Sequence, residues 1–203
     1  MHISLHKNGW TGILEDFDFA TATQAEINQI GKFLATNTLI IAKNQGHLTI
    51  KDECKIAHMF GNVENMDAVA HEKPWNYLLL PDSNNEVMRV TGELDEHGQP
   101  GLFGHVSELD WHCNKPSVPV RMPLVWLLGI KGTAGSRTSW INNIISYQDL
   151  DNDMKEELKD AKMVCGWKKG NYSEFDFSAG KAEEGFNEYY TPNIIHKNVG
   201  DQT

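Results

Sequence analysis

Residues 108–117, ELDWHCNKPS, hold a histidine and an asparagine two positions apart. If this stretch is extended, His112 and Asn114 point to one face, while Trp111 and Cys113 point to the other. A histidine followed two residues later by Asp or Glu supplies two of the three ligands of a 2-His-1-carboxylate iron site, in which the other coordination positions stay open. Asn114 carries no charge, however. Taken alone, the pair therefore favours a hydrogen-bonded structural histidine over a metal ligand.

The composition is that of one globular domain over residues 1–203, because 40% of the 203 residues are hydrophobic. The net charge of −10 argues against a nucleic acid or an anionic membrane surface as the partner. No apolar run approaches the length of a membrane span, and the first residues lack a signal-peptide core. The three scattered cysteines form no CxxC pair, so we expect a reducing, cytoplasmic setting.

Three helices are predicted from capping residues and from apolar side chains at helical spacing. They span residues 22–36, 49–60 and 146–161. The first begins at Thr23 and Glu26, which resemble a capping box, and the second begins at Thr49 and ends at Gly61. In the third helix we expect a buried stripe of Leu150, Met154, Leu158 and Ala161.

Strands are predicted in the middle of the chain from apolar runs bounded by turn residues. They span residues 38–44, 78–84, 86–92, 121–132 and 137–144, and residues 95–101 are expected to form a loop. The predicted class is therefore α+β, with helices packed against a largely antiparallel sheet.

The order of these segments resembles the taurine dioxygenase-like family of Fe(II)/2-oxoglutarate-dependent oxygenases. That family has a W-H-x-D motif, an apolar strand, a strand of the G-G-x-T-x-W-x-N type and a helix with Tyr, Leu and Lys. The matching residues here are Trp111, His112, Gly135, Thr138, Trp140, Asn142, Tyr147, Leu150 and Lys155. The helix–strand–helix region ending in MFGN and the segment YTPNIIHKNVGDQT also resemble the family, so the similarity covers nearly the whole chain. It implies a double-stranded β-helix (jelly-roll) core with flanking helices.

The resemblance also implies an active site with Fe(II) and 2-oxoglutarate that hydroxylates a small organic substrate. His112 resembles the first metal ligand, and Asn114 occupies the position of the carboxylate ligand. Thr138 resembles the residue that hydrogen-bonds 2-oxoglutarate. His105 and Trp111 are candidates for the substrate pocket. A loop histidine satisfied by water and a core tryptophan are the simpler interpretations, and we also expect Trp140 in the core and Cys113 to be packed.

Two departures from the family pattern bear on activity. The amide of Asn114 offers only a neutral oxygen where the family has an anionic one. In addition, nothing in the sequence matches the family's distal histidine or its 2-oxoglutarate-binding arginine. The resemblance therefore implies a C-terminally incomplete oxygenase that lacks its last strands, is inactive as this chain, and binds iron weakly or not at all. Two alternatives remain: a non-catalytic binding module of the same fold, and an unrelated jelly-roll protein.

A jelly roll without its last strands would expose unpaired strand edges and apolar side chains. A second copy of the chain could cover that surface. We therefore expect a homodimer with two-fold symmetry, whose interface includes residues 124–130 and 191–199.

Overall fold

The computed structural model describes residues 1–67, 70–71, 78–98, 101, 109, 111–113, 124–131, 134–135, 137–162, 165–168 and 186–190. The chain divides into two compact units. The first consists of residues 1–110 and 126–137, and the second of residues 111–125 and 138–203. Among the described residues, no helix has both the length and the apolar character needed to cross a membrane.

The first unit is built on a three-stranded sheet of order β1-β2-β3. Its strands are β1 (Ser4–Leu5), β2 (Thr11–Leu14) and β3 (Leu39–Ala42). β1 runs antiparallel to β2, and β2 runs parallel to β3. The strand predicted over 38–44 is confirmed as β3, but the prediction missed β1 and β2. Both are short, and β2 contains a glycine, so neither produces a clear apolar alternation.

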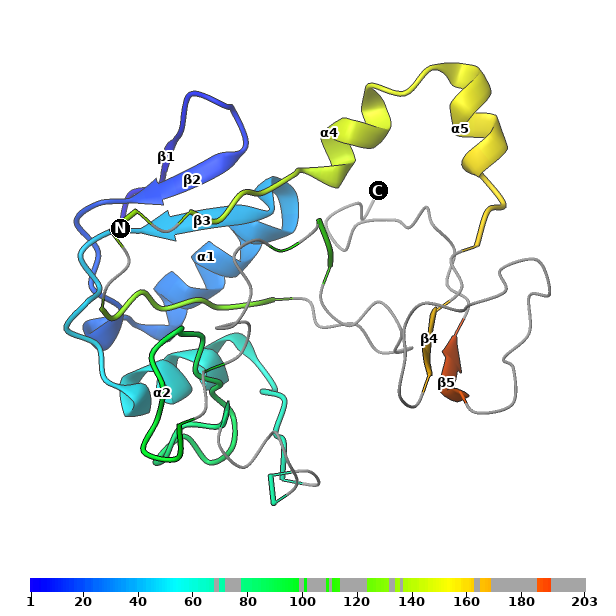
Figure 1. Cartoon of the computed structure of the whole chain (residues 1–203). Helices are drawn as coiled ribbons and strands as arrows, with labels where there is room; N and C mark the ends of the chain where they lie inside the picture. Colours follow the sequence, from blue (N-terminus) through cyan, green and yellow to red (C-terminus); the bar gives the residue numbers. More distant parts are fainter. Residues whose placement is uncertain are drawn as a thin grey trace. The chain divides into compact units, whose positions relative to one another are not determined.

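A parallel pair of strands needs a crossover, which α1 (Gln24–Asn37) provides (Figure 1). Gly12 in β2 permits close packing of the helix on the sheet, because a Cβ at this position would lie only 2.6 Å from the ring of Phe33. Residues 11–42 therefore form a continuous β–α–β unit.

The capping box predicted for α1 is confirmed. Thr23 Oγ1 accepts a hydrogen bond from Glu26 N at 3.4 Å, and Glu26 Oε2 accepts one from Thr23 N at 2.9 Å. The bonds from the Thr23 backbone and hydroxyl lower the pKa of the Glu26 carboxyl. The residue that follows the helix, Thr38, adopts a left-handed conformation with φ of 67° and donates its N–H to Leu34 O. That conformation is rare for a β-branched residue.

The second predicted helix is also confirmed, as α2 (Ile50–Phe60), which stops before Gly61. Its capping box joins Thr49 to Asp52, with Asp52 Oδ2 accepting hydrogen bonds from Thr49 N at 2.9 Å and from Thr49 Oγ1 at 2.7 Å. These bonds lower the pKa of the Asp52 carboxyl, the hydroxyl bond more than the backbone one. Each helix thus begins at a residue whose side chain satisfies backbone donors of the first turn.

The core of the first unit lies between α1, α2 and the sheet. Its buried members are Leu14, Phe19, Ile27, Ile30, Leu48 and Ile56. Gln45 links the end of β3 to this core, since its Oε1 accepts from Phe19 N at 3.1 Å and its Nε2 donates to Phe17 O at 2.6 Å. A buried amide in this position costs little because its polar atoms are paired.

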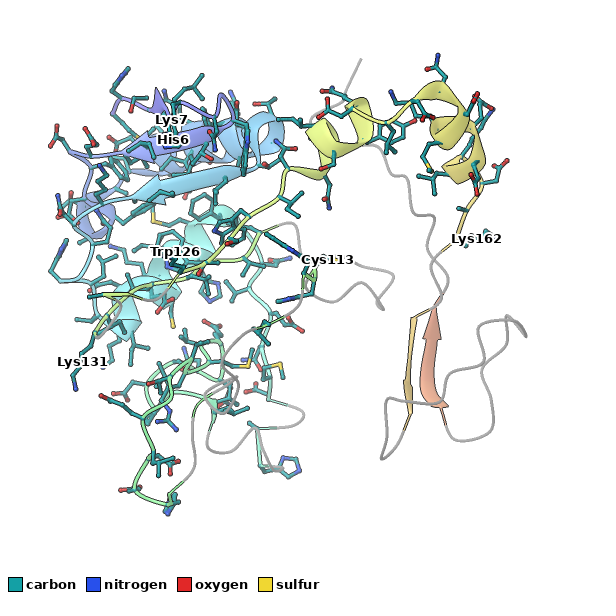
Figure 2. All side chains as sticks on the ribbon, turned by 45° about the horizontal axis from the view of Figure 1, so that its top comes forward. His6, Lys7, Cys113, Trp126, Lys131 and Lys162 are labelled. Carbon is teal, nitrogen blue, oxygen red and sulfur yellow. The ribbon has the colours of Figure 1, made fainter. Side chains whose placement is uncertain are left out.

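Trp126 and Leu128 pack on the same core, but residues 124–131 form no strand, so the strand predicted over 121–132 is wrong for the part that the structure describes. Trp126, which is labelled in Figure 2, and Leu128 contact the core cluster. The Trp126 ring meets Phe19 edge-on, with 4.7 Å between the ring centroids. Val125 and Leu127 are exposed. The segment therefore has the alternating burial of a strand, but pairs with none of the described strands.

The strands predicted over 78–84 and 86–92 pair only at one antiparallel bridge, between Leu79 and Met88. Residues 81–85 form a turn instead, in which Asp82, Asn84 and Asn85 have positive φ. Asn and Asp adopt this conformation readily. The turn therefore interrupts the two strands that the apolar residues on either side of it predict. The loop predicted over 95–101 is confirmed for residues 95–98, the continuous part of it that the structure describes.

In the second unit, the helix predicted over 146–161 is wrong in its bounds. Two short helices occur instead, α4 (Asn143–Gln148) and α5 (Asn152–Leu158). Asn142 caps α4 by accepting from Ile144 N and Ile145 N, while Asp151 caps α5 by accepting from Met154 N at 2.7 Å. These two side chains each start a helix and so divide the segment. None of the four residues of the expected stripe is buried, and Met154 is exposed.

The early start of α4 also overturns the strand predicted over 137–144, because residues 137–142 are irregular. The second unit has one described pair of strands, β4 (Cys165–Lys168) and β5 (Phe186–Tyr190), which run antiparallel. Residues 191–199 of the expected interface lie outside the described residues. The jelly roll remains a prediction.

Candidate functional site

The candidate metal ligand His112 lies in an exposed bend. Trp111, His112 and Cys113 are all exposed, Trp111 to 66% of its surface (Figure 2 labels Cys113). The predictions that Trp111 is a core aromatic and that Cys113 is packed are therefore wrong. Alternation along a strand buries one face only where a second layer covers it, and residues 111–113 are not part of a strand.

Thr138, the candidate 2-oxoglutarate contact, is exposed in the irregular segment that leads into α4. It belongs to the same compact unit as His112. Trp140 in this segment is 47% exposed, so its predicted place in the core is also wrong. Asn142, which the resemblance matched to the W-x-N motif, is buried and acts as the cap of α4.

The other two candidates, Asn114 and His105, lie outside the described residues. The structure therefore brings His112 and Thr138 into one unit and leaves the carboxylate-ligand position untested. Within the described part of the chain, no group of three or more His, Cys, Asp or Glu side chains could hold a metal ion. The described residues supply one candidate iron ligand, His112, and do not by themselves fit an iron centre, which needs three.

The side chain of Lys155 connects α4 and α5, the two helices that follow Thr138. Lys155 in α5 donates to Gln148 O at 2.8 Å and lies 5.7 Å from the centre of the Tyr147 ring in α4. Tyr147 and Lys155 are two of the residues that the resemblance matched, and their contact supports a packing role for both. This side chain therefore joins α4 and α5.

A second group of titratable side chains, in the first unit, was not foreseen from the sequence. His58 Nε2 lies 2.9 and 3.1 Å from the two carboxylate oxygens of Glu86, and Cys54 Sγ donates to Ser83 O at 3.6 Å. Burial raises the pKa of the Cys54 thiol, and the charges of Glu86 and Glu53 raise it further. The thiol therefore stays protonated and is a poor nucleophile.

These contacts fasten the 81–85 turn to α2. Cys54 and His58 are four residues apart on one helix and so share a face. This spacing was the only signal in the sequence, and the position of Glu86 against that face depends on the turn. Glu53, the neighbour of Cys54, is only 8% exposed, and this burial raises the pKa of its carboxyl.

Comparison with known proteins shows a distant likeness to a curated protein. The chain is 21% identical over 145 residues to pentalenolactone F synthase of Streptomyces avermitilis. The match covers 70% of this chain and 44% of that protein, so the chain spans less than half the length of this relative. No protein-family model matches the chain, and neither does any solved structure.

Proposed function

We propose that this chain is an oxygenase-type protein of the Fe(II)/2-oxoglutarate-dependent class, similar to the taurine dioxygenase-like family. The observation that carries the proposal is the ordered series of motifs from His112 through Thr138 to Lys155. The distant likeness to pentalenolactone F synthase favours an oxygenase-type function as well. The proposed substrate is a small organic molecule.

In this proposal His112 is a metal ligand and Thr138 binds 2-oxoglutarate. Both are exposed, so ligands in solvent can reach them. Asn114 stands at the position of the carboxylate ligand, where its neutral amide oxygen would bind iron less strongly than a carboxylate. His105 and Trp111 are the proposed contacts to substrate. We therefore propose that residues 1–203 alone bind iron weakly and do not turn over.

The second candidate is a non-catalytic binding module of the same fold. The neutral side chain of Asn114 favours it, since a family member without the carboxylate can keep a pocket and lose its redox chemistry. The two candidates differ in what a restored carboxylate does. In a longer chain that also carries the family's distal histidine and 2-oxoglutarate-binding arginine, Asn114→Asp should recover both iron binding and the conversion of 2-oxoglutarate to succinate if the protein is an oxygenase. In a binding module, conversion should remain absent.

The first prediction concerns iron. We expect the 203-residue chain to bind Fe(II) weakly under anaerobic conditions, and Asn114→Asp to bind at least about tenfold more tightly, because a charged oxygen replaces a neutral one. His112→Ala, made in the Asn114→Asp background, should abolish the gain. Isothermal titration calorimetry with Fe(II), with and without 2-oxoglutarate, measures these affinities. Succinate formation in air reports turnover, which we expect to be absent from all of these variants of residues 1–203.

His97→Ala is the matched control, since His97 is an exposed histidine in the 95–98 turn and has no proposed role. It should leave the affinity unchanged. If His112→Ala has as little effect as His97→Ala, then His112 is not a ligand and the proposal fails. Tight, stoichiometric iron in the unmodified chain would contradict the weak binding proposed here.

A further inference from the structure

We draw no further inference here: the strongest candidate, the side-chain cluster of Cys54, His58 and Glu86 between α2 and the 81–85 turn, rests on a lone cysteine whose polar contacts are already accounted for by the attachment of that turn to the helix.

Discussion

At the scale of the residue, Glu53 shows most directly what burial does to a charge. Its carboxyl lies in the first turn of α2, where the helix dipole favours a negative charge, yet burial raises its pKa. The cost of removing the charge from water is therefore larger than the benefit of the dipole. A neutral side chain of the same shape would avoid that cost.

We predict that Glu53→Gln increases the free energy of unfolding at neutral pH by about 0.5–1 kcal/mol. Because the pKa of Glu53 is higher in the folded state than in the unfolded state, the penalty develops as the pH rises from the unfolded-state pKa to the folded-state pKa, and it is complete above the folded-state pKa. It is absent below the unfolded-state pKa, where both states are protonated. The advantage of the variant should therefore shrink as the pH falls, which urea denaturation at several pH values would measure.

Glu96→Gln provides the control, because the side chain of Glu96 is 86% exposed and its contact with His97 is a surface pair of little energetic value. It should leave stability nearly unchanged at every pH. A Glu53→Gln variant that is less stable than the original at neutral pH would mean that the carboxylate has a stabilising partner.

The residues of the candidate site show what sequence alone could and could not predict. The types and order of His112, Thr138 and Lys155 were sufficient to suggest a family. Exposure was not predictable, since Trp111 and Cys113 have the apolar character of packed residues but lie in a bend. Burial depends on which segments cover a residue, and a one-dimensional pattern does not contain that information.

At the scale of the element, the success of each prediction depended on local hydrogen bonds. α1 and α2 were predicted correctly because their capping residues lie next to a clear apolar stripe. The 146–161 helix was wrong because Asn142 and Asp151 compete for backbone donors within an apolar pattern that continues across them. The 121–132 strand was wrong because a strand also requires a neighbour to pair with.

We predict that Thr49→Ala lowers the free energy of unfolding by about 1 kcal/mol, because the two hydrogen bonds of the Thr49 hydroxyl, one accepted from Asp52 N and one donated to Asp52 Oδ2, are lost. Thr49→Ser keeps the hydroxyl and should remain close to the original protein. Urea denaturation followed by the helical circular dichroism signal compares the two variants. Equal losses in both would indicate that the methyl group of this exposed threonine, not its hydroxyl, supports α2.

At the C-terminus of α1, we expect a substitution to raise the free energy of unfolding. Thr38 occupies the left-handed region, which costs an ordinary residue roughly 1–2 kcal/mol and glycine almost nothing. We predict that Thr38→Gly raises the free energy of unfolding by about 1 kcal/mol, after the larger chain entropy of glycine is counted. Thermal denaturation measures the difference.

Thr36→Gly is the matched control, two residues earlier and inside the helix, where glycine should destabilise by about 0.5 kcal/mol. The opposite signs of the two changes identify the effect as one of backbone conformation. If both substitutions destabilise the protein, Thr38 is not strained.

At the scale of the whole molecule, the sequence predicts a homodimer whose interface includes residues 124–130. Leu127 and Ile130 in this segment are 60% and 59% exposed. We predict that the chain sediments as a dimer of its 22.9 kDa monomer at micromolar concentration, and that Leu127→Glu shifts it to monomer because the interface would bury an unpaired charge.

Leu5→Glu is the comparison variant, since Leu5 is 57% exposed on β1, outside the predicted interface. It should leave the dimer intact. A monomer at every concentration, in the original chain and in both variants, would refute the dimer. An equal effect of both substitutions would place the interface elsewhere.

The β–α–β unit of residues 11–42 also has a consequence for how the protein is made. Its parallel pairing closes a short loop, which costs less chain entropy than the pairing of distant segments. On the ribosome, where folding proceeds from the N-terminal side, this unit can bury Ile27 and Ile30 against Leu14 while residues 111–138 are still untranslated. The nascent chain therefore already holds a folded β–α–β unit when the segment carrying His112 and Thr138 emerges.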